Sequence, residues 1–208
     1  MIGPSTRTSS GWSPTVIAII IALAAILTTS GCDAVLSTAK LPPVREDGIL
    51  GEWKDLGMRG SKPDRDPVLI RLTNGEYSLG SADQFAKGEA SQFTLARVGN
   101  MLIAQSFSND QCVEFGVEKG QPCWTLNRVE LLPDRLNWYE FDAGRMGKDS
   151  FSGALNIVHS VHRQRKKDGN FDNTVLISAE SQDLRVFLES YVKRPAVFRL
   201  TGRLERIR

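Results

Sequence analysis

The sequence is poor in the residues that carry most catalytic and nucleic-acid chemistry. Among 208 residues there are two histidines and three cysteines, and 26 basic side chains are nearly balanced by 24 acidic ones. A net charge of +2 lies far below the basic excess of most nucleic-acid-binding domains, so we expect no nucleic-acid partner. The chain also lacks a Gly-x-Ser-x-Gly elbow and a glycine-rich phosphate loop.

No cluster of residues indicates a metal site or a catalytic site. His159 and His162 stand three apart, but no third ligand lies beside them in the sequence. Neither histidine accompanies a serine or cysteine nucleophile in a recognisable motif. We therefore expect a protein without catalytic residues, metal or cofactor, with a hydrolase-type enzyme as the remote alternative.

Long apolar runs are also scarce. Val16–Leu27 contains twelve consecutive apolar residues, which at about 1.5 Å per residue cannot cross a hydrocarbon core of about 30 Å. A run of this length behind a polar start is typical of a secretory signal peptide. We therefore expect export of the chain from the cytoplasm.

Ser30-Gly31-Cys32, which follows this run, resembles a bacterial lipobox. The resemblance implies a lipoprotein signal peptide over residues 1–31 and acyl chains such as palmitate on Cys32. The protein would then be anchored in a bilayer of the cell envelope and face the periplasm. Asp33 resembles the signal that retains enterobacterial lipoproteins in the inner membrane, which favours that membrane over the outer one. The alternative is an ordinary signal peptide, or an uncleaved anchor, followed by a chance cysteine.

After the lipobox, residues 32–47 contain Pro42-Pro43 and are expected to form the lipidated cysteine and a flexible tether. The remaining residues, 48–208, are expected to form one folded domain. In this domain, short apolar runs alternate with turn signals, which predicts antiparallel strands.

Two hairpins are the clearest strand signals. Asn74-Gly75 lies between two apolar runs and tolerates positive φ at both positions, which predicts a type I′ turn with Leu72 opposite Tyr77. Gly99-Asn100 separates residues 92–98 from 101–105 and predicts a type II′ turn. Further strands are expected over residues 112–117, 124–131, 136–141, 174–178 and 197–207.

The other segments are less regular. Residues 144–153 are expected to form a loop, and residues 154–164 fit either a strand or a helix. The basic run 163–167 is either a solvated loop or a contact with anionic lipid headgroups. One amphipathic helix is expected near the C-terminus, with Ser181 as a candidate N-cap and Pro195 just beyond its end. Its expected buried stripe is Leu184, Phe187, Leu188, Tyr191 and Val192.

This pattern predicts a mainly β fold. An antiparallel, lipocalin-like β-barrel with one C-terminal amphipathic helix is favoured over a β-sandwich, because closure removes exposed strand edges. Gly51-Glu52-Trp53 resembles the Gly-x-Trp motif that opens the lipocalins and related small bacterial lipoproteins. Leu184–Leu188 also resembles a Leu-x-x-Phe-Leu helix of uncharacterised bacterial envelope lipoproteins. The lipocalin resemblance implies that Trp53 plugs the closed end of the barrel and that a late arginine, Arg199 or Arg203, packs over it.

Two cysteines remain once Cys32 is lipidated. Cys112 and Cys123 form an even pair in an exported domain, which favours a disulfide. Two buried, reduced cysteines are the alternative.

Two functions are consistent with these features. The barrel can bind a small apolar ligand or lipid, lined by aromatic side chains. The same side chains can instead fill a small barrel, and the domain would then be a structural or interaction module that docks to other envelope proteins. The candidate lining residues are Trp53, Tyr77, Phe93, Trp124, Trp138 and Tyr139.

Overall fold

The computed structural model describes residues 34–57, 66–108, 112–113, 115, 117–151, 158–165, 171–194 and 196–207. The predicted signal peptide, Cys32 and Asp33 lie outside these ranges. Among the residues described, no helix is both long enough and apolar enough to cross a membrane.

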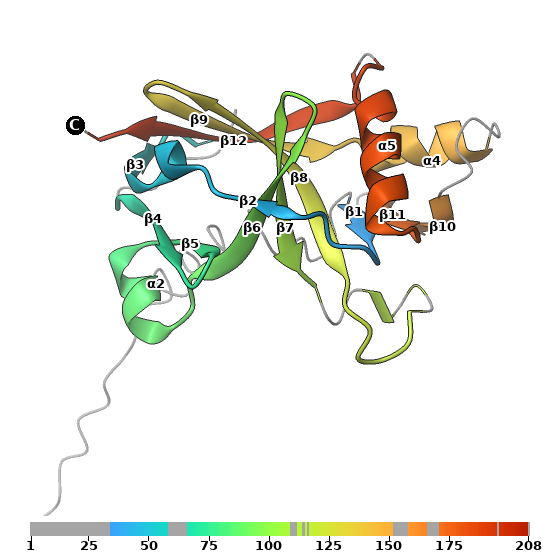
Figure 1. Ribbon diagram of the computed structural model, residues 1–208, viewed down its shortest axis with the longest axis horizontal. Helices are drawn as coiled ribbons and strands as arrows, with labels where there is room; N and C mark the ends of the chain where they lie inside the picture. The colour runs from blue at the N-terminus through green and yellow to red at the C-terminus, as the bar shows by residue number, and fades with distance from the viewer. Residues whose placement is uncertain are drawn as a thin grey trace, which may run out of the picture.

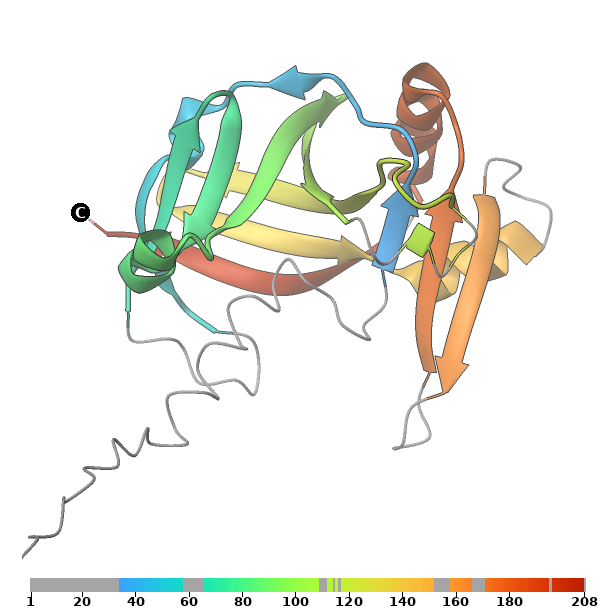
Figure 2. The same ribbon diagram turned by 90° about the horizontal axis from the view of Figure 1, so that it is seen from below.

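The described chain folds around one large sheet (Figures 1 and 2). Its strands are β1 (Ala34–Ser37), β2 (Pro43–Val44), β3 (Gly51–Asp55), β4 (Val68–Thr73), β5 (Glu76–Gly80), β6 (Ser91–Val98), β7 (Met101–Phe107), β8 (Trp124–Leu132), β9 (Arg135–Phe141), β10 (Val158–Arg165), β11 (Phe171–Ile177) and β12 (Phe198–Arg206). The helices are η1 (Asp47–Ile49), α2 (Ala82–Lys87), α4 (Ala143–Phe151) and α5 (Ser181–Tyr191).

Eight of these strands close into an antiparallel barrel. Strands β3 to β9 pair in chain order, and β12 lies between β9 and β3 to complete the circle. The predicted mainly β, lipocalin-like barrel is confirmed, and the β-sandwich alternative is wrong. The last strand belongs to the barrel itself, although α4, β10, β11 and α5 intervene in the chain before it.

Three strands extend the sheet outside the barrel. β1 pairs antiparallel with β8, β11 pairs parallel with β1, and β10 forms the edge. Helix α5 buries its apolar stripe against this extension and the outer face of the barrel, where Leu184 and Leu188 share a core with Val98 and Val175. The predicted helix is confirmed. Glu180 occupies its N-cap position, and the hydroxyl of Ser181 donates to the Lys40 carbonyl instead.

Both predicted hairpins are confirmed. Leu72 lies opposite Tyr77 across the β4–β5 turn, where Asn74 and Gly75 both have positive φ. Val98 lies opposite Met101 across the β6–β7 turn. Local turn chemistry therefore determines this part of the barrel.

The predicted flexible tether is wrong from Ala34 onward. All four residues of β1 are buried, and the strand pairs on both sides with other strands. Leu41 is also buried, and its backbone N–H and carbonyl both bond to the Gln105 side chain. The segment therefore forms part of the folded domain, because its backbone bonds to distant strands and its apolar side chains are buried among them.

Two other local predictions are also wrong. Cys112 and Val113 form a short helical turn rather than the start of a strand over 112–117. The loop predicted over 144–153 is helix α4 as far as Phe151. Glycine disfavours helix, but a Cβ at Gly147 would lie 2.9 Å from Val161, so this glycine lets α4 approach β10 closely.

The ambiguous segment 154–164 is a strand, β10, over its described part. This corrects the loop expected for the basic run as far as Arg165, while Lys166 and Lys167 lie outside the described residues. His159 and His162 are both in β10.

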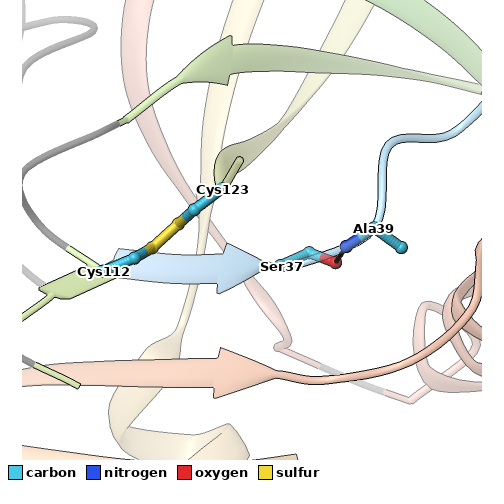
Figure 3. Close-up of a disulfide and its surroundings, with 4 residues drawn as sticks. All are labelled: Ser37, Ala39, Cys112 and Cys123. Atoms are coloured by element: carbon cyan, nitrogen blue, oxygen red, sulfur yellow. Dashed lines mark hydrogen bonds between the residues drawn. A yellow bond between two sulfur atoms is a disulfide. The ribbon is translucent and has the colours of Figure 1, made fainter. Parts of the chain in front are cut away.

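The predicted disulfide between Cys112 and Cys123 is confirmed (Figure 3). Both cysteines are fully buried and pack with Leu36 of β1 and Leu176 of β11. The bridge closes a short loop, for which loop-closure entropy gives about 2–3 kcal/mol of stabilisation. The bridge therefore fixes Cys112, Val117 and Cys123 over one face of β1. Residues of α4 and α5 cover the opposite face.

Candidate functional site

The Gly-x-Trp segment is held against the last strand of the barrel. Trp53 is fully buried, and its indole N–H donates to the Ile49 carbonyl of η1 over 2.9 Å. The guanidinium of Arg206 lies 4.3 Å from the Trp53 ring centroid and donates to the carbonyls of Leu50 and Gly48. A cation over an indole face with two carbonyl partners fixes the turn before β3 to the last strand.

The arginine over Trp53 is Arg206, and the predicted choice of Arg199 or Arg203 is wrong. Arg199 instead pairs with Glu140 at 3.1 Å, and Arg203 is exposed. Strand alternation carries the signal that was missed. Leu204 faces the barrel core, and the residue two positions further along a strand shares its face.

Four of the six candidate lining residues meet inside the barrel. The rings of Tyr77 and Phe93 stack with centroids 5.3 Å apart, and Phe93 meets Trp138 edge-on at 5.5 Å. Together with Trp53, these side chains are at most 3% exposed. They share one core with apolar residues from the other barrel strands, so the aromatic side chains fill this part of the interior.

The other two candidates lie apart from this group. Trp124 contacts the exposed Phe107 at the start of β8, with the Lys40 ammonium 6.0 Å from its ring centroid. Tyr139 faces away from the core residue Trp138, because neighbouring residues of a strand alternate between its faces. The aromatic composition alone could not separate these two positions from the four that are inside.

Six buried side-chain polar atoms of the described residues have no hydrogen-bond partner, and two of them lie in or beside the barrel core. These two are the indole nitrogen of Trp138 and the hydroxyl oxygen of Ser106. Ser106 shares its face of β7 with Ala104, which belongs to the barrel core. Buried polar atoms of this kind are uncommon and are frequently associated with bound water or ligand.

A groove of about 650 Å³ lies at the β6–β7 hairpin, and its lining includes Leu102 and Val129, which also belong to the barrel core. It runs between the β6–β7 hairpin, β8 and the C-terminal end of α5. Its apolar lining is Val98, Met101, Leu102, Val129, Leu131 and Val192, and its charged lining is Glu46, Arg97, Arg128, Glu130, Glu189 and Lys193. Apolar contacts surrounded by charges of both signs are typical of protein–protein interfaces.

Glu130 organises one side of the groove. Its carboxylate accepts hydrogen bonds from the Asn137 amide at 2.8 Å and the Tyr139 hydroxyl at 2.7 Å, and it pairs with Arg128 at 3.4 Å. The bond from Asn137, then that from Tyr139, lowers the pKa of Glu130 against a smaller opposing effect of burial. The Arg128 guanidinium also lies 4.9 Å from the Tyr139 ring centroid, so these residues form one fixed network.

We expect Glu130→Gln to lower stability at neutral pH and to lose this effect in acid. A carboxyl whose folded pKa is lowered stabilises the fold above its unfolded pKa, and this contribution disappears as pH falls through the folded pKa. The measurement is the free energy of unfolding in urea between about pH 3 and pH 7. Glu76→Gln, at an exposed position of the β4–β5 hairpin, controls for the lost charge. If the free energy of unfolding of the variant differs from that of wild type by the same amount at every pH, the ionised Glu130 carboxylate is not the source of the stabilisation.

No metal site emerges from the part of the chain that the structure describes, since no three His, Cys, Asp or Glu residues group there. Comparisons with protein-family models, curated proteins and solved structures find no match to this chain.

Proposed function

We propose that this protein is a non-catalytic lipoprotein of the bacterial cell envelope, anchored through acylated Cys32, whose barrel serves as an interaction module. The observation that carries the proposal is the aromatic filling of the barrel around Phe93 and Trp138. A barrel filled in this way has a rigid shape but little room for cargo. The Gly-x-Trp segment and its arginine support a kinship with lipocalin-like lipoproteins in shape, because the implied clasp recurs here with Arg206.

The groove beside α5 is the surface through which the module would bind its partner. Its apolar floor suits the apolar side chains of a protein segment, and its charged rim suits flanking polar groups. The rim already contains the Arg97–Glu46 pair at 3.0 Å, which holds the β6–β7 hairpin to the segment before η1. A preorganised groove of this kind loses little freedom when a partner binds.

A second candidate is binding of a small ligand within the barrel. The unpartnered atoms of Trp138 and Ser106 favour it, because a ligand acceptor or donor would satisfy them. The four packed aromatic rings oppose it, because they occupy the space that an apolar ligand would need.

The two candidates can be separated in the bacterium that makes the protein. A photo-crosslinking amino acid is placed at Met101 in the groove of the full chain, and the matched control is placed at Phe107. Both residues lie on β7, at opposite ends, and Phe107 is 61% exposed. We expect a discrete protein crosslink from Met101 and none from Phe107.

Other outcomes decide against the proposal. Equal crosslinking at both positions, or none at Met101, would contradict docking in the groove. Native mass spectrometry of the purified protein tests the alternative directly. A small-molecule adduct that is released on denaturation would favour the ligand carrier over the filled scaffold.

A further inference from the structure

The folded domain begins at once after the proposed lipid-bearing residue. Only Asp33 separates Cys32 from Ala34, the first residue of β1. Two residues span at most about 7 Å of extended chain. An anchor on Cys32 therefore holds the start of β1 beside the headgroups, with no tether to lift the domain away.

The pairing of β1 shows what else lies at this end of the molecule. Ala34 pairs with Thr174 of β11, and Thr174 pairs with His162 of β10. Because β11 is parallel to β1, its residues before Thr174 lie on the side from which the chain enters. The β10–β11 hairpin accordingly extends beyond the start of β1 (Figure 2). On β10 this overhang continues for three residues, or about 10 Å.

Two of these three residues are basic. Arg163 and Arg165 occupy register positions opposite Asn173 and Phe171, and Gln164 lies between them opposite Asp172. The overhang thus carries an excess of positive charge on the edge strand of the sheet. A basic residue near an anionic bilayer surface is attracted to the lipid headgroups.

We propose that the β10–β11 end of the domain is its membrane-facing surface, with Arg163 and Arg165 placed at the level of anionic phospholipid headgroups. The inference rests on the proposed anchoring at Cys32, because the anchor determines which end of β1 meets the bilayer. The occupant is an anionic lipid headgroup, since the entering chain and the basic overhang lie on the same side.

The test uses the full lipidated protein purified from the bacterium and placed in vesicles of phosphatidylcholine, with or without phosphatidylglycerol. Hydrogen exchange is measured for the amides of β10. We expect exchange about tenfold slower on the vesicles that contain phosphatidylglycerol. The double substitution Arg163→Glu and Arg165→Glu should abolish this difference. If the charge reversal impairs folding, the double substitution Arg163→Gln and Arg165→Gln replaces it, and this variant should reduce the difference.

The matched control is the pair Arg135→Glu and Arg203→Glu. Both positions are exposed, Arg135 at the start of β9 and Arg203 in the second half of β12, and neither strand pairs with β10 or β11. The slowing should therefore persist in this variant. No lipid-dependent slowing, or slowing that survives loss of both β10 arginines, would overturn the inference. So would equal slowing by soluble glycerophosphoglycerol, which assigns an anion site independent of a bilayer. Mass spectrometry of the N-terminal peptide separates these results from failure of the anchor, because an unmodified Cys32 would refute the proposed function itself.

Discussion

Replacing Trp53 with alanine is expected to lower the free energy of unfolding by about 3–5 kcal/mol, the usual range for a large aromatic residue removed from a core. Trp53 is fully buried and donates to the Ile49 carbonyl. The substitution leaves a cavity in the barrel core and leaves Arg206 without the ring beneath it. Natural domains have only about 5–15 kcal/mol of total stability, so the variant is expected to be close to unfolding at elevated temperature.

Urea denaturation followed by circular dichroism measures this loss. Trp124→Ala is the matched control, because Trp124 is the same residue type but lies outside the barrel core beside exposed Phe107. We expect it to cost about 1 kcal/mol or less. Equal losses at Trp53 and Trp124 would show that the stability of the barrel does not depend specifically on Trp53.

The arginine above the plug can be examined separately. Arg206→Ala should be destabilising and should couple to Trp53→Ala, so that the double variant loses less than the sum of the two single variants. Arg203→Ala, at an exposed position of the same strand, should not couple. Such a result would assign the interaction to Arg206 by energy as well as by geometry.

The parts of the fold that were predicted correctly depend on short stretches of sequence. Asn74-Gly75 permits positive φ at both positions, and the burial of Tyr77 and Leu79 on one face then sets the register. Helix α5 likewise has its apolar spacing within eleven residues. Such signals can be recognised in a single sequence, because the residues that produce each one lie close together in the chain.

The parts that were predicted wrongly depend on partners far away in the chain. β1 has only four residues, and it becomes a strand because β8 and β11 hydrogen-bond to it on both sides. Helix α4 contains Gly147, which lowers helix propensity, yet the close approach of Val161 requires a residue without a Cβ there. Tertiary contacts of this kind overrule local preference and have no local signature.

The same contrast between local and long-range signals applies to the candidate site. Residue type identified the four aromatic positions of the core, but it also nominated Tyr139, which alternation along β9 places on the opposite face from Trp138. The groove was missed because it is formed by three elements that are distant in sequence, the β6–β7 hairpin, β8 and the end of α5. No spacing within one segment indicates such a surface.

Replacing Cys32 with alanine is expected to abolish lipidation and to remove the mature protein from the membrane fraction. Two or more acyl chains give stable anchoring, and the thiol of Cys32 is the atom proposed to carry the lipid. The measurement is metabolic labelling with an alkyne fatty acid, followed by detergent partition and mass spectrometry of the N-terminal peptide. Wild type should give a peptide that begins at Cys32 and carries lipid, and the variant should give none.

The double variant Cys112→Ala and Cys123→Ala is the matched control, because it removes two other cysteines and leaves the lipobox intact. It should keep the fatty-acid label but have a lower free energy of unfolding, because the disulfide fixes the residues that pack on Leu36 of β1. Label that persists in Cys32→Ala would indicate another acylation site, and an unlabelled wild-type chain would leave an ordinary signal peptide or an uncleaved anchor. Because β1 begins at Ala34, lipidation of Cys32 also determines how the domain is oriented at the membrane. Lipid on Cys32 fixes the domain against the bilayer in one orientation, whereas a free N-terminus would leave every face of the barrel, the groove included, equally open to soluble partners.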